Sequence, residues 1–206
     1  MVSPARAARL SLLWTVLLLP CCIAAQSKPT HLHTPVINLP RGTVTHILSP
    51  DRKWMLIFEL IGDPLTEGCP GAEEVKRKLW IQRKGSSERK LVREFERSLD
   101  VSWSPDSRHF FINDASGSNG TLAYVYDTET LKVVDVQEML AAASRGVRNF
   151  EADHFYVQAK HWVSPDALLV TVNGYLSSTP PTPGLSGSYT VHLNGVVRTI
   201  REGYWR

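Results

Sequence analysis

The sequence predicts an all-β fold made of three similar units, each a small antiparallel sheet of four strands. The first observation behind this is a tripeptide, Ser-Pro-Asp, that occurs three times between stretches able to form strands. The copies are Ser49-Pro50-Asp51, Ser104-Pro105-Asp106 and Ser164-Pro165-Asp166. Proline presets φ at the first corner of a type I turn, and the Asp carboxylate can accept hydrogen bonds from backbone N–H groups beside it. Each copy is therefore expected to reverse the chain between two strands.

The spacing of the copies is the second observation. Ser49 precedes Ser104 by 55 residues, and Ser104 precedes Ser164 by 60, which is room for four short strands in each repeat. A period of this length is typical of β-propellers, whose blades have four strands. The expected blades cover residues 41–97, 98–136 and 149–201 of a domain that extends over 41–206.

Residues 1–25 have the features of a secretory signal peptide. Arg6 and Arg9 precede an apolar run from Leu10 to Leu19, and Ile23-Ala24-Ala25 supplies the small residues that a signal peptidase needs. The run is about half the roughly 20 residues that span a bilayer, so we favour a signal over a membrane anchor. We expect cleavage after Ala25 and a periplasmic or secreted protein with no transmembrane segment.

The three cysteines leave a second interpretation of this terminus open. Leu18 to Cys22 resembles the cleavage box of bacterial lipoproteins, which would anchor the chain through a lipid on Cys21 or Cys22. After cleavage at Ala25, Cys69 is the remaining cysteine, so the fold has no internal disulfide and its core must hold it together. We interpret Cys69 as an incidental loop residue; intermolecular pairing or a reactive thiol is the alternative.

Residues 26–40 are polar and interrupted by prolines, and we expect an N-terminal arm that donates one edge strand from Val36 to Leu39. His31, His33 and His46 could suggest a metal site, because histidines two apart share a face of a strand. The prolines and the lack of a nearby acidic residue favour solvent-exposed histidines instead.

The first repeat contains the run Trp54 to Phe58, which is continuously apolar, as in a strand covered on both faces. A Gly- and Pro-rich loop over 62–78 follows, with a charged end that we expect to be solvated. Residues 79–95 then predict a hairpin whose outer strand alternates charged and apolar residues, a pattern that protects a sheet edge.

The second repeat predicts four strands within 98–136, and one short helix follows at about 136–144. Asp135 and Glu138 have the spacing of a capping box, and Gly146 can end the helix. We expect the helix to cover one rim of a sheet; a partner-binding surface is the alternative. The third repeat ends in a hairpin around Asn194-Gly195, a strong two-residue turn signal.

The Ser-Pro-Asp turns and the segment Tyr124 to Thr130 resemble the WD40-like repeats of exported bacterial proteins. That family includes the propeller of the Tol-type translocation protein and the propellers of some peptidases, and the resemblance covers roughly residues 41–201. It implies a propeller whose rim loops, here 62–78, 113–121 and 177–187, meet a protein partner in the cell envelope. The family has glycine after the Asp, whereas this chain has Arg52, Ser107 and Ala167. We therefore expect turns that need no positive φ at that position.

Three blades are fewer than the four to eight of closed propellers. Two terminal faces, each expected to be apolar, must then be covered. Either two chains form a homodimeric six-bladed ring, or the sheets pack differently, or the arm and helix cap the ends.

Motifs that would indicate catalysis are missing from the sequence. It has no Gly-x-Ser-x-Gly, Gly-rich phosphate loop, His-Glu-x-x-His or paired-cysteine motif. We therefore predict no catalytic residue, metal ligand or cofactor, and no ligand-binding residue is assigned. Asp153, His154, His161 and Asp166 could form an acid–base or metal cluster, but we interpret the histidines as sheet residues bonded to the backbone. Asn119-Gly120-Thr121 is a formal glycosylation sequon that we expect to be unmodified in a bacterial protein.

The net charge argues against a nucleic-acid partner. It is +3 for the whole chain and +1 without Arg6 and Arg9, whereas a nucleic-acid surface needs a basic excess. The sequence therefore predicts an exported, non-catalytic protein-binding module. The alternative is a periplasmic hydrolase or enzyme subunit with a site on the propeller rim.

Overall fold

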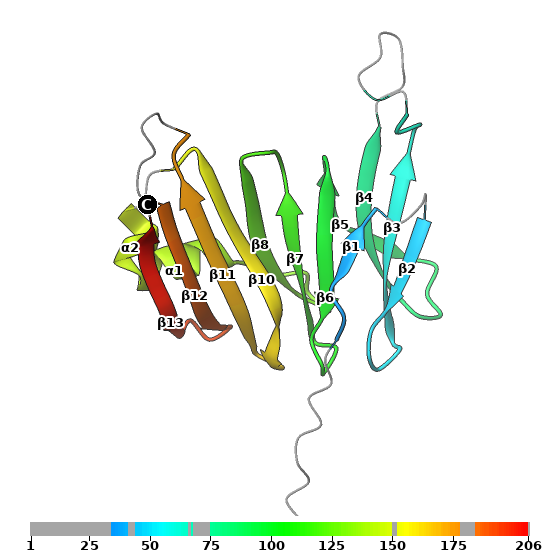
Figure 1. The fold of residues 1–206 in the computed structure, drawn as a ribbon. Coiled ribbons are helices and arrows are strands. Elements are labelled where there is room, and N and C mark those ends of the chain that lie inside the picture. Colours follow the sequence, from blue (N-terminus) through cyan, green and yellow to red (C-terminus); the bar gives the residue numbers. More distant parts are fainter. Residues whose placement is uncertain are drawn as a thin grey trace, which may run out of the picture. The chain divides into compact units, whose positions relative to one another are not determined.

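The structure is a computed structural model that describes residues 34–40, 44–65, 67, 75–149, 152–177 and 184–205. This part of the chain is predominantly β and contains two short helices (Figure 1). The strands are β1 (Ile37–Leu39), β2 (Val44–Leu48), β3 (Trp54–Ile61), β4 (Lys76–Arg83), β5 (Arg89–Phe95), β6 (Ser98–Trp103), β7 (His109–Ala115), β8 (Gly120–Asp127), β9 (Val133–Asp135), β10 (His154–Ser164), β11 (Ala167–Tyr175), β12 (Gly184–His192) and β13 (Val197–Trp205). The helices are α1 (Val136–Ala143) and α2 (Arg145–Asn149). Neither helix is long and apolar enough to cross a membrane.

The strands form three successive antiparallel meanders. The first meander is β2–β3–β4–β5, the second is β6–β7–β8–β9, and the third is β10–β11–β12–β13, each strand pairing with the next. The three Ser-Pro-Asp turns join the first two strands of each meander and lie at the same, lower edge in Figure 1. From the arm, β1 pairs with β6, with Ile37 opposite Val101 and Leu39 opposite Leu99.

The second and third meanders are joined into one sheet, which the sequence does not predict. The start of β10 pairs in parallel with the start of β8, Phe155 opposite Gly120 and Tyr156 opposite Thr121. A Cβ at Gly120 would lie 3.2 Å from the carbonyl oxygen of Phe155, so the absence of a side chain lets the backbones approach. The result is an open nine-stranded sheet beside a separate four-stranded one.

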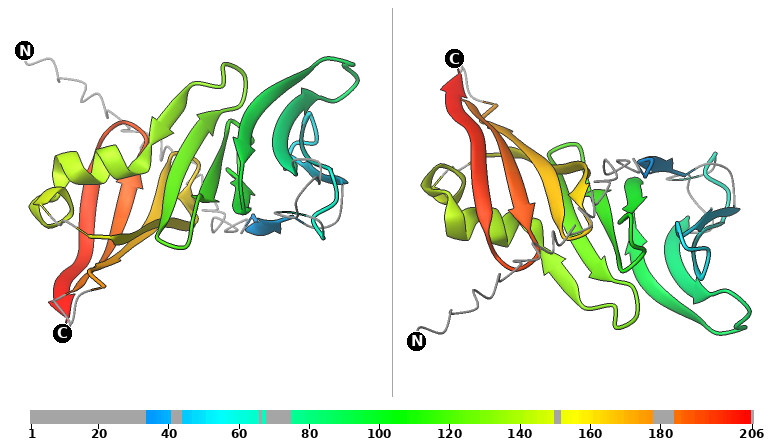
Figure 2. Two further views of the ribbon diagram at one scale, coloured as in Figure 1. Left: turned by 90° about the horizontal axis from the view of Figure 1, so that it is seen from above. Right: turned by 90° about the horizontal axis from the view of Figure 1, so that it is seen from below.

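Two apolar layers hold the meanders together. Between the first and second meanders lies a layer that includes Leu56, Phe58, Leu79, Phe110 and Ile112. Between the second and third meanders lies another, to which Val136, Leu140 and Val147 of the helices belong. Figure 2 shows both helices beside the third meander. The second meander is therefore covered on both faces, which explains the consecutive apolar residues Phe110, Phe111 and Ile112 in β7.

The first strands of successive meanders repeat one hydrogen bond. The indole N–H of Trp103 on β6 donates to the carbonyl of Ile47 on β2, over 3.3 Å. The indole N–H of Trp162 on β10 donates to the carbonyl of Ser102 on β6, also over 3.3 Å. Both acceptors stand two residues before the Ser of a Ser-Pro-Asp turn, so β6 meets β2 in the same way as β10 meets β6.

The helical segment differs in part from the prediction. Helix α1 starts as expected, because the Asp135 carboxylate accepts hydrogen bonds from the amides of Gln137 (2.8 Å) and Glu138 (3.2 Å). Gly146 does not end it, however, and instead lies inside a second helix, α2. The reason is Ser144, whose hydroxyl accepts a hydrogen bond from the amide of Val147 and so caps a new helical turn.

Candidate functional site

The Ser-Pro-Asp turns are held by the same small network in the first two copies. The Ser49 hydroxyl donates to Asp51 Oδ1 over 2.7 Å and accepts from the amide of Trp54 over 3.0 Å. The second copy repeats these bonds at 2.7 and 2.9 Å between Ser104, Asp106 and His109. In the third copy the turn is tighter, since Ser164 and Ala167 are already paired residues of β10 and β11.

The expectation that these turns need no positive φ is wrong for the first two copies. Arg52 has φ +58° and Ser107 has φ +64°. Both lie in the left-handed region, where the family pattern has glycine. The network of Ser and Asp side chains fixes the residues on either side and so imposes this conformation on a residue that disfavours it.

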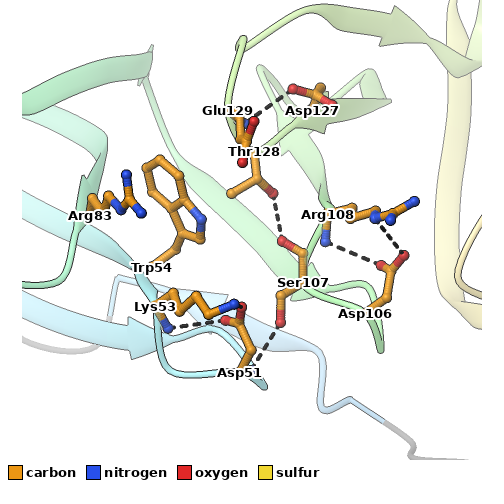
Figure 3. A pocket seen from close by; sticks show the side chains of 10 residues that line it. All are labelled: Asp51, Lys53, Trp54, Arg83, Asp106, Ser107, Arg108, Asp127, Thr128 and Glu129. Carbon is orange, nitrogen blue, oxygen red and sulfur yellow. Dashed lines mark hydrogen bonds and ion pairs between the residues drawn. The ribbon is translucent and has the colours of Figure 1, made fainter.

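A polar hollow of about 520 Å³ opens beside these two turns (Figure 3). The first meander lines it with Asp51, Lys53, Trp54 and Arg83, and the second with Asp106, Ser107, Arg108, Asp127, Thr128 and Glu129. A smaller hollow of about 170 Å³ shares Trp54, Arg83, Thr128 and Glu129 with it and continues along the β4–β5 hairpin. We call the two hollows together the turn-end groove. Two of the sequence-predicted turn residues, Asp51 and Asp106, thus line the same hollow.

Two hydrogen bonds, one of them between the first and second meanders, fix the floor of the turn-end groove. The amide of Asp51 donates to the Ser107 hydroxyl over 3.0 Å, and the Thr128 hydroxyl donates to the Ser107 carbonyl over 2.9 Å. Ser107 and Thr128 are both buried. The first turn, the second turn and the β8–β9 hairpin are therefore held in one arrangement.

Two carboxylates of the turn-end groove, Asp51 and Asp127, are stabilised in their ionised form. Partial burial raises the pKa of Asp51, but the hydrogen bonds from the Ser49 hydroxyl and the Lys53 amide outweigh this and hold the pKa below its ordinary value. Partial burial likewise raises the pKa of Asp127, and the amide and hydroxyl of Thr130 lower it further than burial raises it. Both side chains are therefore negatively charged at neutral pH.

A second surface is the side of the first meander that points away from the second. Strand alternation and register place one set of side chains there, which we call the β2–β5 outer face. Its members are Val44, His46, Leu48, Met55, Ile57, Glu59, Ile61, Lys76, Lys78, Trp80, Gln82, Arg89, Leu91 and Glu94. Val44 (54%), Leu48 (48%), Ile61 (44%) and Leu91 (42%) are exposed to these fractions, so the face has an unburied apolar component.

Trp80 stands among the charged residues of the β2–β5 outer face. Its indole N–H donates to Glu59 over 2.9 Å, and the guanidinium of Arg89 lies 4.4 Å from the ring centroid. Arg89 also pairs with Glu59 at 3.4 Å, and Lys78 pairs with Glu94 at 3.0 Å. These contacts hold the ring and the cations in fixed positions beside the apolar residues.

The opposite terminal face, on the third meander, is polar, which corrects the expectation of two apolar ends. The side chains that alternate away from the core on β10, β11, β12 and β13 include Gln158, Thr171, Ser186, Ser188 and Arg201. The alternate positions on the same strands, such as Val157, Val172 and Val191, are buried. The third meander thus has the one-sided pattern of a sheet that faces water.

The residues of the imagined acid–base or metal cluster lie apart. His154 begins β10 and its ring stacks on Tyr175 with centroids 4.5 Å apart, whereas Asp166 stands in the turn at the other end of that strand. The Asp153 carboxylate accepts from the amide of Ser177, at 2.9 Å. His161 lies beside the irregularity in β10. In the part of the chain that the structure describes, no three His, Cys, Asp or Glu residues are grouped so that they could hold a metal ion.

Several predictions concern residues outside those described. These are the signal peptide over 1–25, the lipid anchor at Cys21 or Cys22, His31 and His33 of the arm, and Cys69. Parts of the 62–78 and 177–187 loops also lie there. The sequon residue Asn119 is described and lies on the surface before β8.

Sequence reasoning missed the residues that form both surfaces. The sequence predicts strands at Trp54 and over 79–95 but assigns no surface to them, whereas Trp54 lies in the turn-end groove and Trp80 on the β2–β5 outer face. Strand alternation could have placed the side chain of Trp80 on the other face of its strand from those of Leu79 and Ile81. The turn-end groove has no such signal, because Trp54, Arg83, Asp106 and Glu129 come from four separate turns or strand ends.

Comparison with known proteins gives little. No protein-family model matches the chain, and no curated protein matches it in sequence. Among solved structures, the chain is similar to one from a study of two prolyl endopeptidases and the role of inter-domain dynamics in their catalysis and specificity. The TM-score is 0.40 and the identity 14%, over 79% of this chain and 28% of that one. The chain thus spans under a third of that protein's length, and a likeness at this level carries no argument about function.

Proposed function

We propose that this chain is an exported, non-catalytic protein-binding module of the cell envelope, and that its β2–β5 outer face is the binding surface. The three meanders serve in this proposal as three blades of a partial WD40-like propeller. The hydrogen bond from an indole to a carbonyl recurs between the first strands of successive meanders. It supports that arrangement, because a propeller repeats one blade-to-blade contact.

The observation that carries the proposal is the mismatch between the sequence of β3 and its surroundings. The run Trp54 to Phe58 is continuously apolar, the pattern of a strand covered on both sides. Leu56 and Phe58 point into the layer shared with the second meander. Met55, which is half-buried, and Ile57, which is buried, point to the β2–β5 outer face. The apolar layer shared with the second meander lies on the other side of the sheet.

The composition of the β2–β5 outer face suits a protein partner. The exposed aliphatic side chains stand at strand ends and on the edge strand β5, beside charged residues and a tryptophan: Val44 is opposite Glu59, Ile61 opposite Lys76 and Leu91 opposite Trp80. Binding energy at protein interfaces concentrates in Trp, Tyr and Arg, and a polar rim encloses an apolar centre. The partner should therefore present an apolar, sheet-like surface with a few charges, similar to the faces that the meanders present to one another.

The polar face of the third meander bears on the idea of a ring built from two chains. In a two-chain ring, the first meander of each copy would pack on the third meander of the other. That contact would bury Gln158, Thr171, Asn173, Ser186 and Ser188 against aliphatic side chains, which is costly for polar groups without partners. We therefore expect a different protein, rather than a second copy in a ring, to cover the β2–β5 outer face.

Photo-crosslinking in the native host tests the proposal. A benzophenone amino acid at position 48 or 91 should crosslink one defined partner protein, and the same amino acid at Ile200, exposed on β13, should not. With that partner purified, Leu91→Glu should weaken binding by about tenfold or more, whereas Ile200→Glu should leave it unchanged. Equal crosslinking from all three positions would contradict the proposal. A crosslinked species made of two identical chains would show that a second copy of this chain, rather than a different protein, covers the face.

The alternative, a periplasmic hydrolase or enzyme subunit with a site on the rim, has no specific observation in its favour. It stays a hypothesis, and hydrolysis of a peptide or ester panel by the purified chain would establish it.

A further inference from the structure

The turn-end groove has features that the protein-binding proposal does not use. It lies at the edge where the first and second Ser-Pro-Asp turns meet, whereas the β2–β5 outer face is one side of a sheet. From the first meander come Trp54 and Arg83, and from the second come Thr128 and Glu129, all four shared by the two hollows (Figure 3). The indole therefore stands at the junction of a continuous depression rather than at the end of a closed cavity.

We infer that the turn-end groove is a binding site for a neutral saccharide chain, with one sugar ring resting on Trp54. The apolar part of the larger hollow is essentially this indole, which provides a flat surface for the C–H face of a pyranose. A peptide would need pockets for apolar side chains, and the larger hollow has none. Ile81 is the aliphatic residue in the smaller one.

The charges of the groove favour a ligand without net charge. Lys53, Arg83 and Arg108 face the carboxylates of Asp51, Asp106, Asp127 and Glu129 around the larger hollow. Cations and anions alternate around it, so neither an anionic nor a cationic ligand gains a uniform field. A hydroxyl group both donates and accepts hydrogen bonds, and it can therefore use a carboxylate and a guanidinium that stand side by side.

Two of these charged side chains are available for such bonds. Among the described residues, the guanidinium of Arg83 and the carboxylate of Glu129 take part in no hydrogen bond or ion pair. The neighbouring pairs are loose: Lys53 lies 3.5 Å from Asp51, and Arg108 lies 3.8 Å from Asp106, with 71% and 81% of the basic side chains exposed. The bond from the Asp51 amide to the Ser107 hydroxyl joins the two walls, and the bond from the Thr128 hydroxyl to the Ser107 carbonyl fixes the second one, so binding would need little rearrangement.

The test uses the full mature chain and a defined panel of probes. Hexamers of neutral β-glucan, chitin, mannan and xylan are titrated by calorimetry, together with acidic uronate hexamers and with mixed-sequence hexapeptides. At least one neutral hexamer should bind. Trp54→Ala should weaken that binding by about tenfold or more, and Trp54→Phe should restore part of it.

Further variants keep the test sharp if Trp54→Ala destabilises the fold. Arg83→Ala and Glu129→Gln alter exposed side chains and should each weaken binding several-fold at unchanged melting temperature. Trp80→Ala, a tryptophan of the β2–β5 outer face, and Leu91→Glu should leave saccharide binding intact, so this inference and the protein-binding proposal can fail separately. If no neutral hexamer binds, if only the uronates or the peptides bind, or if Arg83→Ala and Glu129→Gln have no effect, the inference is wrong.

Discussion

At the scale of single residues, Arg52 and Ser107 adopt the same left-handed backbone conformation with different consequences. A left-handed residue other than glycine costs about 1–2 kcal/mol, and glycine gives back about 0.5–1 kcal/mol through the entropy of the unfolded chain. Arg52→Gly should therefore raise the free energy of unfolding by about 0.5 kcal/mol. The measurement is the midpoint of a urea unfolding curve.

Ser107→Gly provides the matched comparison for Arg52→Gly. It relieves the same backbone strain but removes the hydroxyl that accepts a hydrogen bond from the amide of Asp51. That loss of about 1 kcal/mol or more should make Ser107→Gly neutral or destabilising. Equal stabilisation by both substitutions would show that the hydrogen bond between the Asp51 amide and the Ser107 hydroxyl contributes nothing to the free energy of unfolding.

Tyr189 gives a prediction for alkaline solution. Burial raises its pKa, and the hydrogen bond to the Glu202 carboxylate raises it further. A raised pKa in the folded state contributes stability that is complete below about pH 10, the value in the unfolded chain, and is lost as the pH rises beyond it. The free energy of unfolding should thus fall more steeply above pH 10 for the natural chain than for Tyr189→Phe. Parallel curves would contradict this account.

At the scale of elements, the junction of α1 and α2 is tied to the outer strand of the third meander through one carboxylate. Glu202 accepts hydrogen bonds from the Ser144 hydroxyl (2.5 Å) and from the Tyr189 hydroxyl. A Cβ on Gly146 would collide with this carboxylate. A side chain at position 146 would therefore displace the Glu202 carboxylate from this place.

Gly146→Ala should displace the Glu202 carboxylate and destabilise the fold by about 1 kcal/mol, because the buried Tyr189 hydroxyl loses its acceptor. Gly203→Ala is the control, since a Cβ there meets nothing within 4 Å. Thermal unfolding of both variants measures the difference. If Gly146→Ala is as stable as Gly203→Ala, the helices are held by their apolar contacts alone.

At the scale of the whole molecule, the meanders are not equally connected. The β8–β10 ladder joins the second and third meanders, whereas side-chain contacts join the first to the second among the described residues. Local opening should therefore release the first meander at a lower free energy than the third. Amides of β3 and β4 should exchange with deuterated water faster than those of β11.

Trp103→Phe tests the connection directly. It removes the indole donor and leaves the carbonyl of Ile47 without that bond. Exchange should become faster in β3 and β4 and stay unchanged in β11. A uniform change over all strands would instead indicate that the three meanders open as one unit.

The strands and their order could be predicted because they depend on local patterns. The Ser-Pro-Asp turns, the apolar run in β7 and the Asp135 cap are each visible within a few residues. The left-handed φ at Arg52 and Ser107 was missed because side-chain networks override the preference of the residue itself. The polar side of β11 could have been recognised, since Thr171 and Asn173 alternate with Val170 and Val172.

The join of β8 to β10 and the turn-end groove could not be predicted in this way. Gly120 and Phe155 are brought together by the position of the helices and the third meander, and no local pattern in the chain indicates it. The groove likewise depends on how the first meander packs on the second, through an apolar layer that any pair of amphipathic sheets could form.

The pairing of β1 with β6 sets an order of events during synthesis. Leu39 and Leu99 are opposite each other although the whole first meander lies between them in the chain. On a ribosome, β1 emerges long before its partner strand and must wait, unpaired, while β2 to β5 form local hairpins. Closing so long a loop is slow and gains few bonds. The arm should therefore be the last part of the N-terminal half to become ordered, and a nascent chain halted before residue 98 would expose the apolar side of the first meander to chaperones.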